Sequence, residues 1–208
     1  MPWIKALRPI CGTSTALLVI SGFRHANQPI DWIVVATVFF ITSMAMIWND
    51  YHDREIDVAK GRFLASKQPA IFLCYALGLA TVSLALSLWV LFQNVMFGSL
   101  CLGMWVASML YNKAQSNPFA KNVIVSLNVA ATVTFPLFLD TKITRLWFMA
   151  AYVFVVISIR EYIKDVEDME VDRDRKLTLA LVLDSRISDR SATYIRHLMS
   201  LLLVALMV

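Results

Sequence analysis

The residues best suited to chemistry directly follow an uncharged apolar run at residues 32–48. Asn49, Asp53 and Asp57 are each four residues apart, so on a helix their oxygen-bearing side chains lie along one face. A lone aspartate at this place would be explained as a helix end emerging into water. Three such side chains at helical spacing instead favour a cation site, because carboxylates at membrane depth are costly and usually functional.

A second acidic array follows the apolar run at residues 147–159. Its four carboxylates are spaced i, i+4, i+7 and i+11, which again places them on one helical face. They are Glu161, Asp165, Asp168 and Asp172, and the basic residues Arg160 and Lys164 flank them. Mg²⁺ typically reaches a protein through one or two carboxylates together with water and substrate phosphates. The two arrays therefore predict a pocket in which Mg²⁺ and a phosphate-bearing ligand lie between them.

The chain around these arrays is more apolar than an ordinary soluble domain. It is 59% hydrophobic and its mean hydropathy is +0.65. Several apolar segments reach the roughly 17–25 residues that a helix needs to cross a bilayer. Seven segments are predicted, at about 9–23, 30–48, 69–92, 95–111, 119–139, 145–163 and 191–208. They indicate an all-α fold, a polytopic transmembrane helical bundle that forms one domain over residues 1–208.

The positive charges divide unequally between the two sides of such a bundle. Sixteen of the 19 Lys and Arg residues fall on the side that also carries both acidic arrays. The other side has only Arg24, Lys142 and Arg145. Because positive residues are retained in the cytoplasm, the loops that carry the arrays are predicted to be cytoplasmic. The net charge of +4 thus reflects topology and gives no reason to expect nucleic acid as a partner.

Several other kinds of site are not indicated by the sequence. Cys11, Cys74 and Cys101 fall inside apolar runs without Cys-x-x-Cys spacing, so neither a disulfide framework nor a zinc site is expected. The sequence also has no Gly-rich phosphate loop, no Walker pattern and no Ser-His-Asp arrangement.

The two arrays resemble two signatures of the UbiA superfamily of intramembrane prenyltransferases. The first signature, Asn-Asp-x-x-Asp-x-x-x-Asp, is matched by Asn49, Asp50, Asp53 and Asp57. The second is close to Arg-Glu-x-x-Lys-Asp-x-x-Asp-x-x-Gly-Asp and is matched by Arg160, Glu161, Lys164, Asp165, Asp168 and Asp172. The resemblance covers about residues 5–180 and also includes Arg8-Pro9, Arg62 and Tyr111.

The resemblance implies a Mg²⁺-dependent enzyme that transfers a prenyl group from an allylic prenyl diphosphate to a small acceptor in the lipid bilayer. The catalytic residues that it implies are Asp53, Asp57, Asp168, Asp172 and Lys164. The implied ligands of Mg²⁺ are Asn49, Asp50, Asp53, Asp57, Asp165, Asp168 and Asp172. The implied substrate contacts are Asn49, Arg62, Tyr111, Asn128, Arg160 and Tyr162.

The chain departs from the family pattern at several positions. Val171 replaces a glycine of the second signature, and Phe63 follows Arg62 where proline is common. Gln115 stands where the family has a lysine in the linker after the fourth segment. The family fold has nine transmembrane helices, whereas this sequence reaches Val208 in its seventh apolar segment. We therefore expect the natural protein to continue for two more helices.

Two other functional classes stay open at this stage. A divalent-cation or proton-coupled carrier also uses intramembrane carboxylates, but it usually places them near the bilayer midplane. An inactive, truncated homologue would act only as a partner within a helical bundle. For an enzyme, the acceptor is expected to be a quinone-precursor aromatic compound or a glycerol or sugar phosphate. Both signatures are nearest to the branch that includes archaeal ether-lipid and homogentisate-type enzymes.

Overall fold

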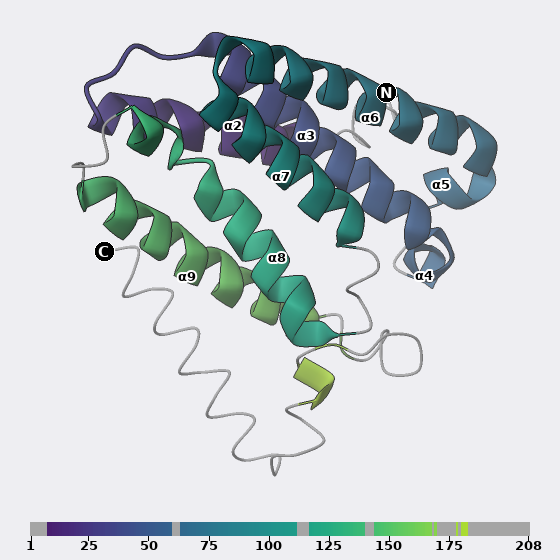
Figure 1. Ribbon diagram of the computed structural model, residues 1–208. Coiled ribbons are helices and arrows are strands. Elements are labelled where there is room, and N and C mark those ends of the chain that lie inside the picture. The colour runs from purple at the N-terminus through teal and green to yellow at the C-terminus, as the bar shows by residue number, and fades with distance from the viewer. Residues whose placement is uncertain are drawn as a thin grey trace, which may run out of the picture.

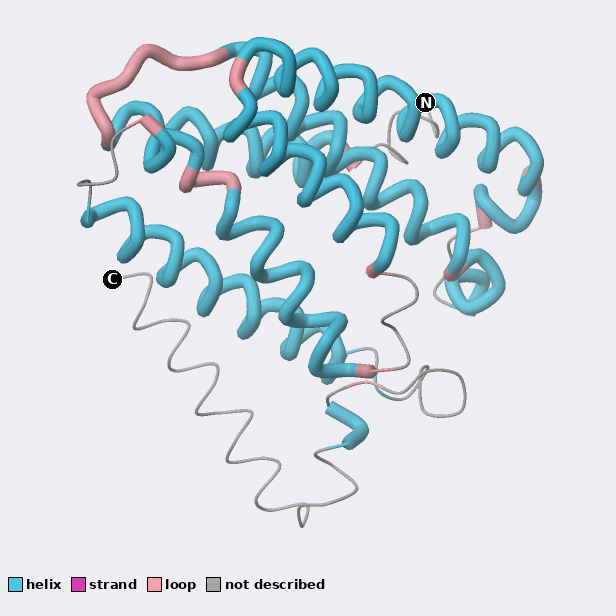
Figure 2. The backbone as a smooth tube through the Cα atoms, viewed as in Figure 1, coloured by secondary structure: helices cyan, strands magenta, loops and turns pink. Residues whose placement is uncertain are grey.

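The computed structural model describes residues 8–59, 63–111, 117–139, 144–167, 169, 178 and 180–182. Within these ranges the regular elements are all helices, joined mostly by short connections (Figures 1 and 2). They are α2 (Pro9–His25), α3 (Trp32–His52), α4 (Arg54–Ala59), α5 (Leu64–Lys67), α6 (Pro69–Gln93), α7 (Val95–Leu110), α8 (Pro118–Ala131), the 3₁₀ helix η2 (Phe135–Phe138) and α9 (Thr144–Glu167). The predicted all-α fold class is confirmed.

The first six predicted segments correspond to α2, α3, α6, α7, α8 and α9, while the segment at 191–208 lies outside the described residues. Two helices continue past their apolar runs into the acidic arrays, α3 to His52 and α9 to Glu167. The fifth segment is shorter than predicted, because α8 ends at Ala131 and η2 follows. Pro136 accounts for the break, since proline lacks an N–H and its ring clashes with the carbonyl four residues earlier in a continuous helix.

Polar residues and prolines in the sequence define where several helices begin. The side chains of Asp31, Asn94 and Asn117 accept hydrogen bonds from backbone N–H groups in the first turns of α3, α7 and α8. Pro9 and Pro69 stand at the starts of α2 and α6, where the N–H that proline lacks has no partner within the helix. These local signals explain why the helix starts were predicted to within about two residues.

The helices contact one another in a ring. Starting from α2, each packs against the next in the order α3, α6, α7, α8 and α9, and α9 contacts α2 again. In Figure 1, α2, α3, α6 and α7 lie side by side and the pair α8 and α9 packs along them. Phe97 packs in the core, where its ring makes edge-to-face contacts with Phe23 and Phe135 at centroid distances of 6.0 and 5.6 Å.

The helices α6 and α7 approach each other closely where they are connected. Asn94 alone separates them. A Cβ on Gly98 of α7 would lie 2.1 Å from the Cα of Leu91 on α6, so no side chain fits there. On the same helix Gly103 has no other atom within 4 Å of such a Cβ. The indole of Trp105 also joins α7 to α6, donating to the Ala80 carbonyl and to the Ser83 hydroxyl.

Within the described residues, three helices, α3, α6 and α9, are long and apolar enough to cross a membrane by length and composition. Large apolar side chains are also exposed on the outside of the bundle, among them Phe92 and Phe148 at 87% and 73% exposure. An apolar surface of this kind is unusual for a protein in water and suits contact with lipid.

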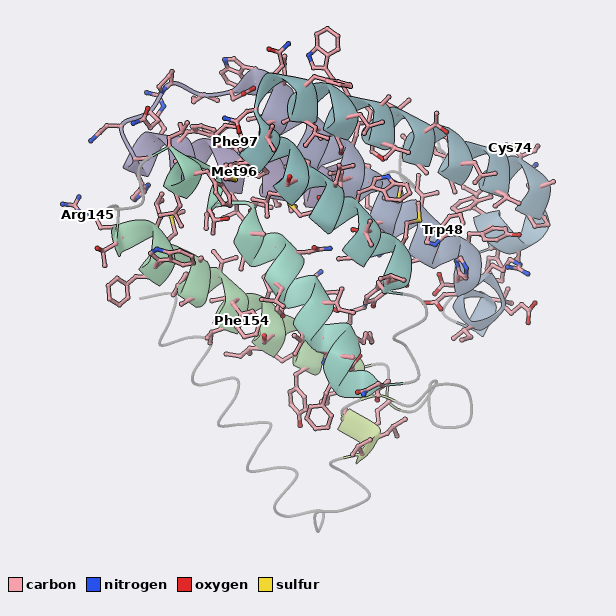
Figure 3. All side chains as sticks on the ribbon, viewed as in Figure 1. Trp48, Cys74, Met96, Phe97, Arg145 and Phe154 are labelled. Atoms are coloured by element: carbon pink, nitrogen blue, oxygen red, sulfur yellow. The ribbon has the colours of Figure 1, made fainter. Side chains whose placement is uncertain are left out.

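The two ends of the bundle differ in their chemistry. Figure 3 shows Trp48 and Cys74 at one end, and Met96, Phe97 and Arg145 at the other. The first end carries the described members of both acidic arrays. It is formed by the start of α2, the junction of α3 and α4, the end of α7, the start of α8 and the end of α9, and is called the polar end below.

Candidate active site

The first acidic array is formed where α3 passes into α4. Backbone hydrogen bonds from Asp53 N–H to the Asn49 carbonyl, at 2.9 Å, and from Asp57 N–H to the Asp53 carbonyl, at 2.8 Å, carry the helical register through the junction. The three side chains therefore stack on one face, as their spacing predicted. The Asn49 amide donates to the Asp53 carboxylate at 3.3 Å. Asp53 and Asp57 are buried, with 8% and 6% of their surface exposed.

Asp50 lies beside this array and is paired with Arg8 at the start of α2. The distance from Arg8 Nη2 to Asp50 Oδ1 is 2.5 Å. The Arg8 backbone has φ 44° and ψ 58°, a left-handed conformation that is uncommon for a residue other than glycine. It directly precedes Pro9, which further restricts its backbone. The ion pair therefore connects a strained residue at the start of α2 to the end of α3.

The second array is buried against α8. Glu161 and Asp165 are 4% and 2% exposed, and lie one turn apart on α9 as predicted. Asp165 receives two hydrogen bonds from the first turn of α8: Lys121 Nζ donates to Oδ1 at 2.8 Å, and Asn122 Nδ2 donates to Oδ2 at 3.3 Å. The remaining members of the array, Asp168 and Asp172, lie outside the residues whose side chains are described, as does Arg62.

Basic side chains surround Glu161. Arg160 Nη1 donates a hydrogen bond to its Oε1 atom, and Lys164 Nζ lies 4.0 Å from Oε2. The positive charges of Lys121 and Arg8 also act on Lys164. Lys164 is therefore part of the polar end, as the sequence predicted, with Glu161 as its ion-pair partner among the described residues.

The pKa of Tyr111, which follows the last residue of α7, is affected by charges from both arrays. Burial raises the pKa of its phenol above the ordinary value. The negative charge of Glu161 raises the pKa further, followed by those of Asp53 and Asp165, while the positive charge of Arg8 lowers it. Asp53 from the first array and the two carboxylates from the second therefore all act electrostatically on this hydroxyl group.

Two further residues implied by the resemblance lie within helix contacts. Asn128 joins α8 to α7, because its amide donates to the Met104 carbonyl at 3.3 Å and to the Ser108 hydroxyl at 3.2 Å. Tyr162 is buried on α9. Their contacts with a substrate stay predictions.

Sequence reasoning missed Lys121 and Asn122 as members of this site. Both are buried, at 8% and 6% exposure, although they belong to a mostly apolar helix. A signal was present, because a lysine and an asparagine in the first turn of a membrane helix need partners there. The sequence does not show which partner they have, since Asp165 follows Lys121 by 44 residues.

The described residues around the first array suit Mg²⁺ in part. No group of three or more His, Cys, Asp or Glu side chains among the described residues is arranged to hold a metal ion. Asp50 and Asp165 each have a cationic partner. Asn49, Asp53 and Asp57 offer hard oxygen atoms, and two carboxylates are what Mg²⁺ typically takes from a protein when phosphate oxygens and water complete its shell.

The described carboxylates of two acidic arrays thus lie at one end of an apolar helical bundle, and this combination is found in a known family of membrane enzymes. The UbiA prenyltransferase family matches residues 10–208, and the chain belongs to this family. A curated relative, the digeranylgeranylglyceryl phosphate synthase of Thermococcus sibiricus, is 30% identical over 183 residues. That match covers 82% of this chain and 64% of the relative, so the chain spans less than two thirds of the relative's length.

A solved structure shows the same fold. It comes from work on the biosynthesis of digeranylgeranylglyceryl phosphate synthase in membranes, and it matches 98% of this chain and 74% of its own chain with a TM-score of 0.69. The sequence identity of 21% is low, so this likeness concerns the fold alone.

Proposed function

We propose that the protein transfers a prenyl group from an allylic prenyl diphosphate to the hydroxyl of a prenylated glyceryl phosphate, at the polar end of a bundle that spans the bilayer. The observation that carries this proposal is that buried carboxylates of both arrays, Asp53 and Asp57 from the first with Glu161 and Asp165 from the second, lie at the same end of the bundle. The acceptor class is supported by the relative from Thermococcus sibiricus, whose name describes a glyceryl phosphate with two geranylgeranyl groups. Its acceptor would carry one such group.

The residues of the first array would hold the metal. Mg²⁺, when bound, supplies positive charge for the diphosphate that leaves as the C–O bond of the prenyl donor breaks. Asn49, Asp53 and Asp57 are the described residues that would bind it, and Asp168 and Asp172 are expected to join them. Lys164 and Arg160 would donate hydrogen bonds to diphosphate oxygens, together with Arg62.

Tyr111 suits the developing prenyl cation. A phenol with the ordinary pKa of 10.0 is already neutral at pH 7, and burial raises the pKa of Tyr111 further, so the residue brings no anion that could capture the cation. The face of its ring could stabilise a nearby cation by about 0.5–2 kcal/mol. The apolar tail of the donor would lie among the side chains of the bundle, and the bilayer supplies both lipid substrates.

The test is Mg²⁺-dependent transfer from labelled geranylgeranyl diphosphate by the full-length protein in membranes. We expect transfer to geranylgeranylglyceryl phosphate, and a loss of several orders of magnitude in Asp53→Asn and Asp57→Asn. Glu55→Gln is the matched control, because this carboxylate lies on α4 between the two aspartates but is 85% exposed at its side chain. Unchanged transfer in Asp53→Asn would contradict the proposal.

A panel of acceptors tests the finer part of the proposal. Transfer to a quinone-precursor aromatic acid, with none to the glyceryl phosphate, would support prenyltransferase activity but contradict the proposed acceptor. Cation flux in liposomes without any diphosphate release would instead favour a carrier.

A further inference from the structure

Asn122, near the start of α8, has a buried side-chain amide of which the nitrogen atom has a hydrogen-bond partner and the oxygen atom has none among the described residues. Its Nδ2 atom donates to Asp165 Oδ2 at 3.3 Å. Its Oδ1 atom is buried and has no hydrogen-bond partner among the residues that the structure describes. Buried carbonyl oxygens are rarely left unpaired in folded proteins, so a donor from outside this set of residues is expected.

The direction of the amide is determined by its neighbours. Asp165 accepts from Lys121 Nζ through one oxygen and from Asn122 through the other. An ionised carboxylate can only accept hydrogen bonds, so the amide nitrogen must face it. The reversed amide would place its oxygen against a carboxylate oxygen. Oδ1 of Asn122 is therefore held as an acceptor that cannot turn to Asp165.

The place of this oxygen distinguishes it from another unpaired buried atom. Ser43 Oγ also lacks a partner among the described residues. It lies between α2 and α3, only 3.1 Å from the place of a Cβ on Gly12, where the helices pack closely. Asn122 instead adjoins Asp165, whose charge reaches Tyr111 at the polar end.

We propose that Asn122 Oδ1 accepts a hydrogen bond from the hydroxyl group of the prenyl acceptor and so selects a hydroxyl-bearing acceptor. This inference rests on the proposed function. A neutral amide oxygen orients an O–H group without adding negative charge beside a diphosphate. A site built to bind a hydroxyl discriminates against an analogue without one, because its buried acceptor is then left unpaired. Lys121 acts as a positioning residue, since it neutralises the carboxylate that holds the amide.

The experiment compares two ligands and three proteins. Dissociation constants are measured in nanodiscs for geranylgeranylglyceryl phosphate and for its deoxy analogue, in which hydrogen replaces the free hydroxyl. We expect the wild type to bind the hydroxyl compound about tenfold more tightly than the analogue. Asn122→Ala should bind both compounds with equal affinity.

Ser126→Ala is the matched control. This serine is also buried on α8, where its hydroxyl accepts from Ser158 of α9, and its loss should leave the wild-type preference intact. If Asn122→Ala does not fold, Asn122→Leu keeps a similar volume, also removes the amide oxygen and should likewise lose the preference.

Two results separate this inference from the proposed function. A hydroxyl preference that is equal in the wild type and in the Asn122 variants overturns the inference, even where transfer is observed. The expected loss of preference, found in a protein that transfers no prenyl group to any acceptor, supports the hydroxyl site and overturns the proposed function.

Discussion

At the scale of single residues, the ion pair between Lys121 and Asp165 joins two helices deep in the bundle. Their side chains are 10% and 3% exposed, so neither charge is well solvated. Removing one member of such a pair leaves the other buried without compensation, which is more costly than never having the pair.

We therefore expect Lys121→Met to lower the free energy of unfolding by about 3–5 kcal/mol. The double variant Lys121→Met/Asp165→Leu should recover part of this loss, because apolar residues often replace a buried pair without penalty. Unfolding in detergent measures both. Glu55→Gln is the control, since its pair with Arg54 is 3.8 Å long and its side chain is 85% exposed, and a change below about 1 kcal/mol is expected. A double variant no more stable than Lys121→Met would refute this account.

Tyr111 gives a prediction for the dependence of stability on pH. The pKa of its phenol is raised above the ordinary value of 10.0 in the folded protein. The folded state therefore holds this proton more tightly than the unfolded state, and the resulting stability is fully present below pH 10 and is lost as the pH rises further. We expect the difference in Tm between the wild type and Tyr111→Phe to be constant up to about pH 9 and then to fall. A difference in Tm between the two proteins that stays constant up to pH 11 would contradict this prediction.

The sequence predicted some of these residues and not others for a physical reason. Asn49, Asp53 and Asp57 share a face because helical register is local and follows from spacing. The partners of Asp50 and Asp165 depend on how helices pack, since Arg8 and Lys121 are 42 and 44 residues away in the chain. Because the sequence does not show which helix packs against each aspartate, both aspartates were predicted to be ligands of a metal.

At the scale of helices, the contact between α6 and α7 depends on a residue without a side chain. Gly98 lies against the backbone of Leu91, and a Cβ there would be 2.1 Å from its Cα. Backbone cannot move aside as the end of a flexible side chain can, so α7 would have to shift.

We expect Gly98→Ala to destabilise the protein by about 1–3 kcal/mol or more, as overpacking does elsewhere. Gly103→Ala is the matched control on the same helix, because its Cβ would meet no other atom within 4 Å. Alanine also favours a helix over glycine, so the control should be neutral or more stable by up to about 1 kcal/mol. Thermal unfolding in detergent measures both changes. Equal Tm values for the two variants would contradict the close approach.

Helix starts were easier to predict than helix ends. Asp31, Asn94 and Asn117 mark starts through side chains that bond within one turn. The apolar run ends at residue 48, and the extension of α3 to His52 was indicated only by the helical spacing of Asn49, Asp53 and Asp57. The end of α8 at Ala131 was missed, since Pro136 comes only five residues later.

At the scale of the whole molecule, the bundle has a strongly charged end and a weakly charged one. The polar end carries the described members of the acidic arrays and several basic residues, among them Arg8, Lys121 and Lys164. Arg145 lies at the other end (Figure 3), and Arg24 lies in the last turn of α2. The unequal distribution of positive charge predicts that the polar end faces the cytoplasm.

Labelling of introduced cysteines tests this orientation. In a variant without Cys11, Cys74 and Cys101, we expect a cysteine at Gln28 to react with a membrane-impermeant maleimide in intact cells. A cysteine at Lys67 should react only after permeabilisation. Gln28 lies in the connection between α2 and α3, and Lys67 is the last residue of α5 at the polar end. The opposite pattern of labelling would reverse the orientation and place the candidate site outside the cytoplasm.

The one-residue connection at Asn94 has a consequence for biosynthesis. With 16 residues, α7 is shorter than the roughly 17–25 that an independent spanning helix needs, whereas α6 has 25. The indole of Trp105 also depends on α6 for its hydrogen bonds. We therefore expect the translocation machinery to receive α7 together with α6, as one hairpin. Deleting α6 should leave α7 accessible to protease at the membrane surface, whereas a chain ending just after α7 should protect both helices.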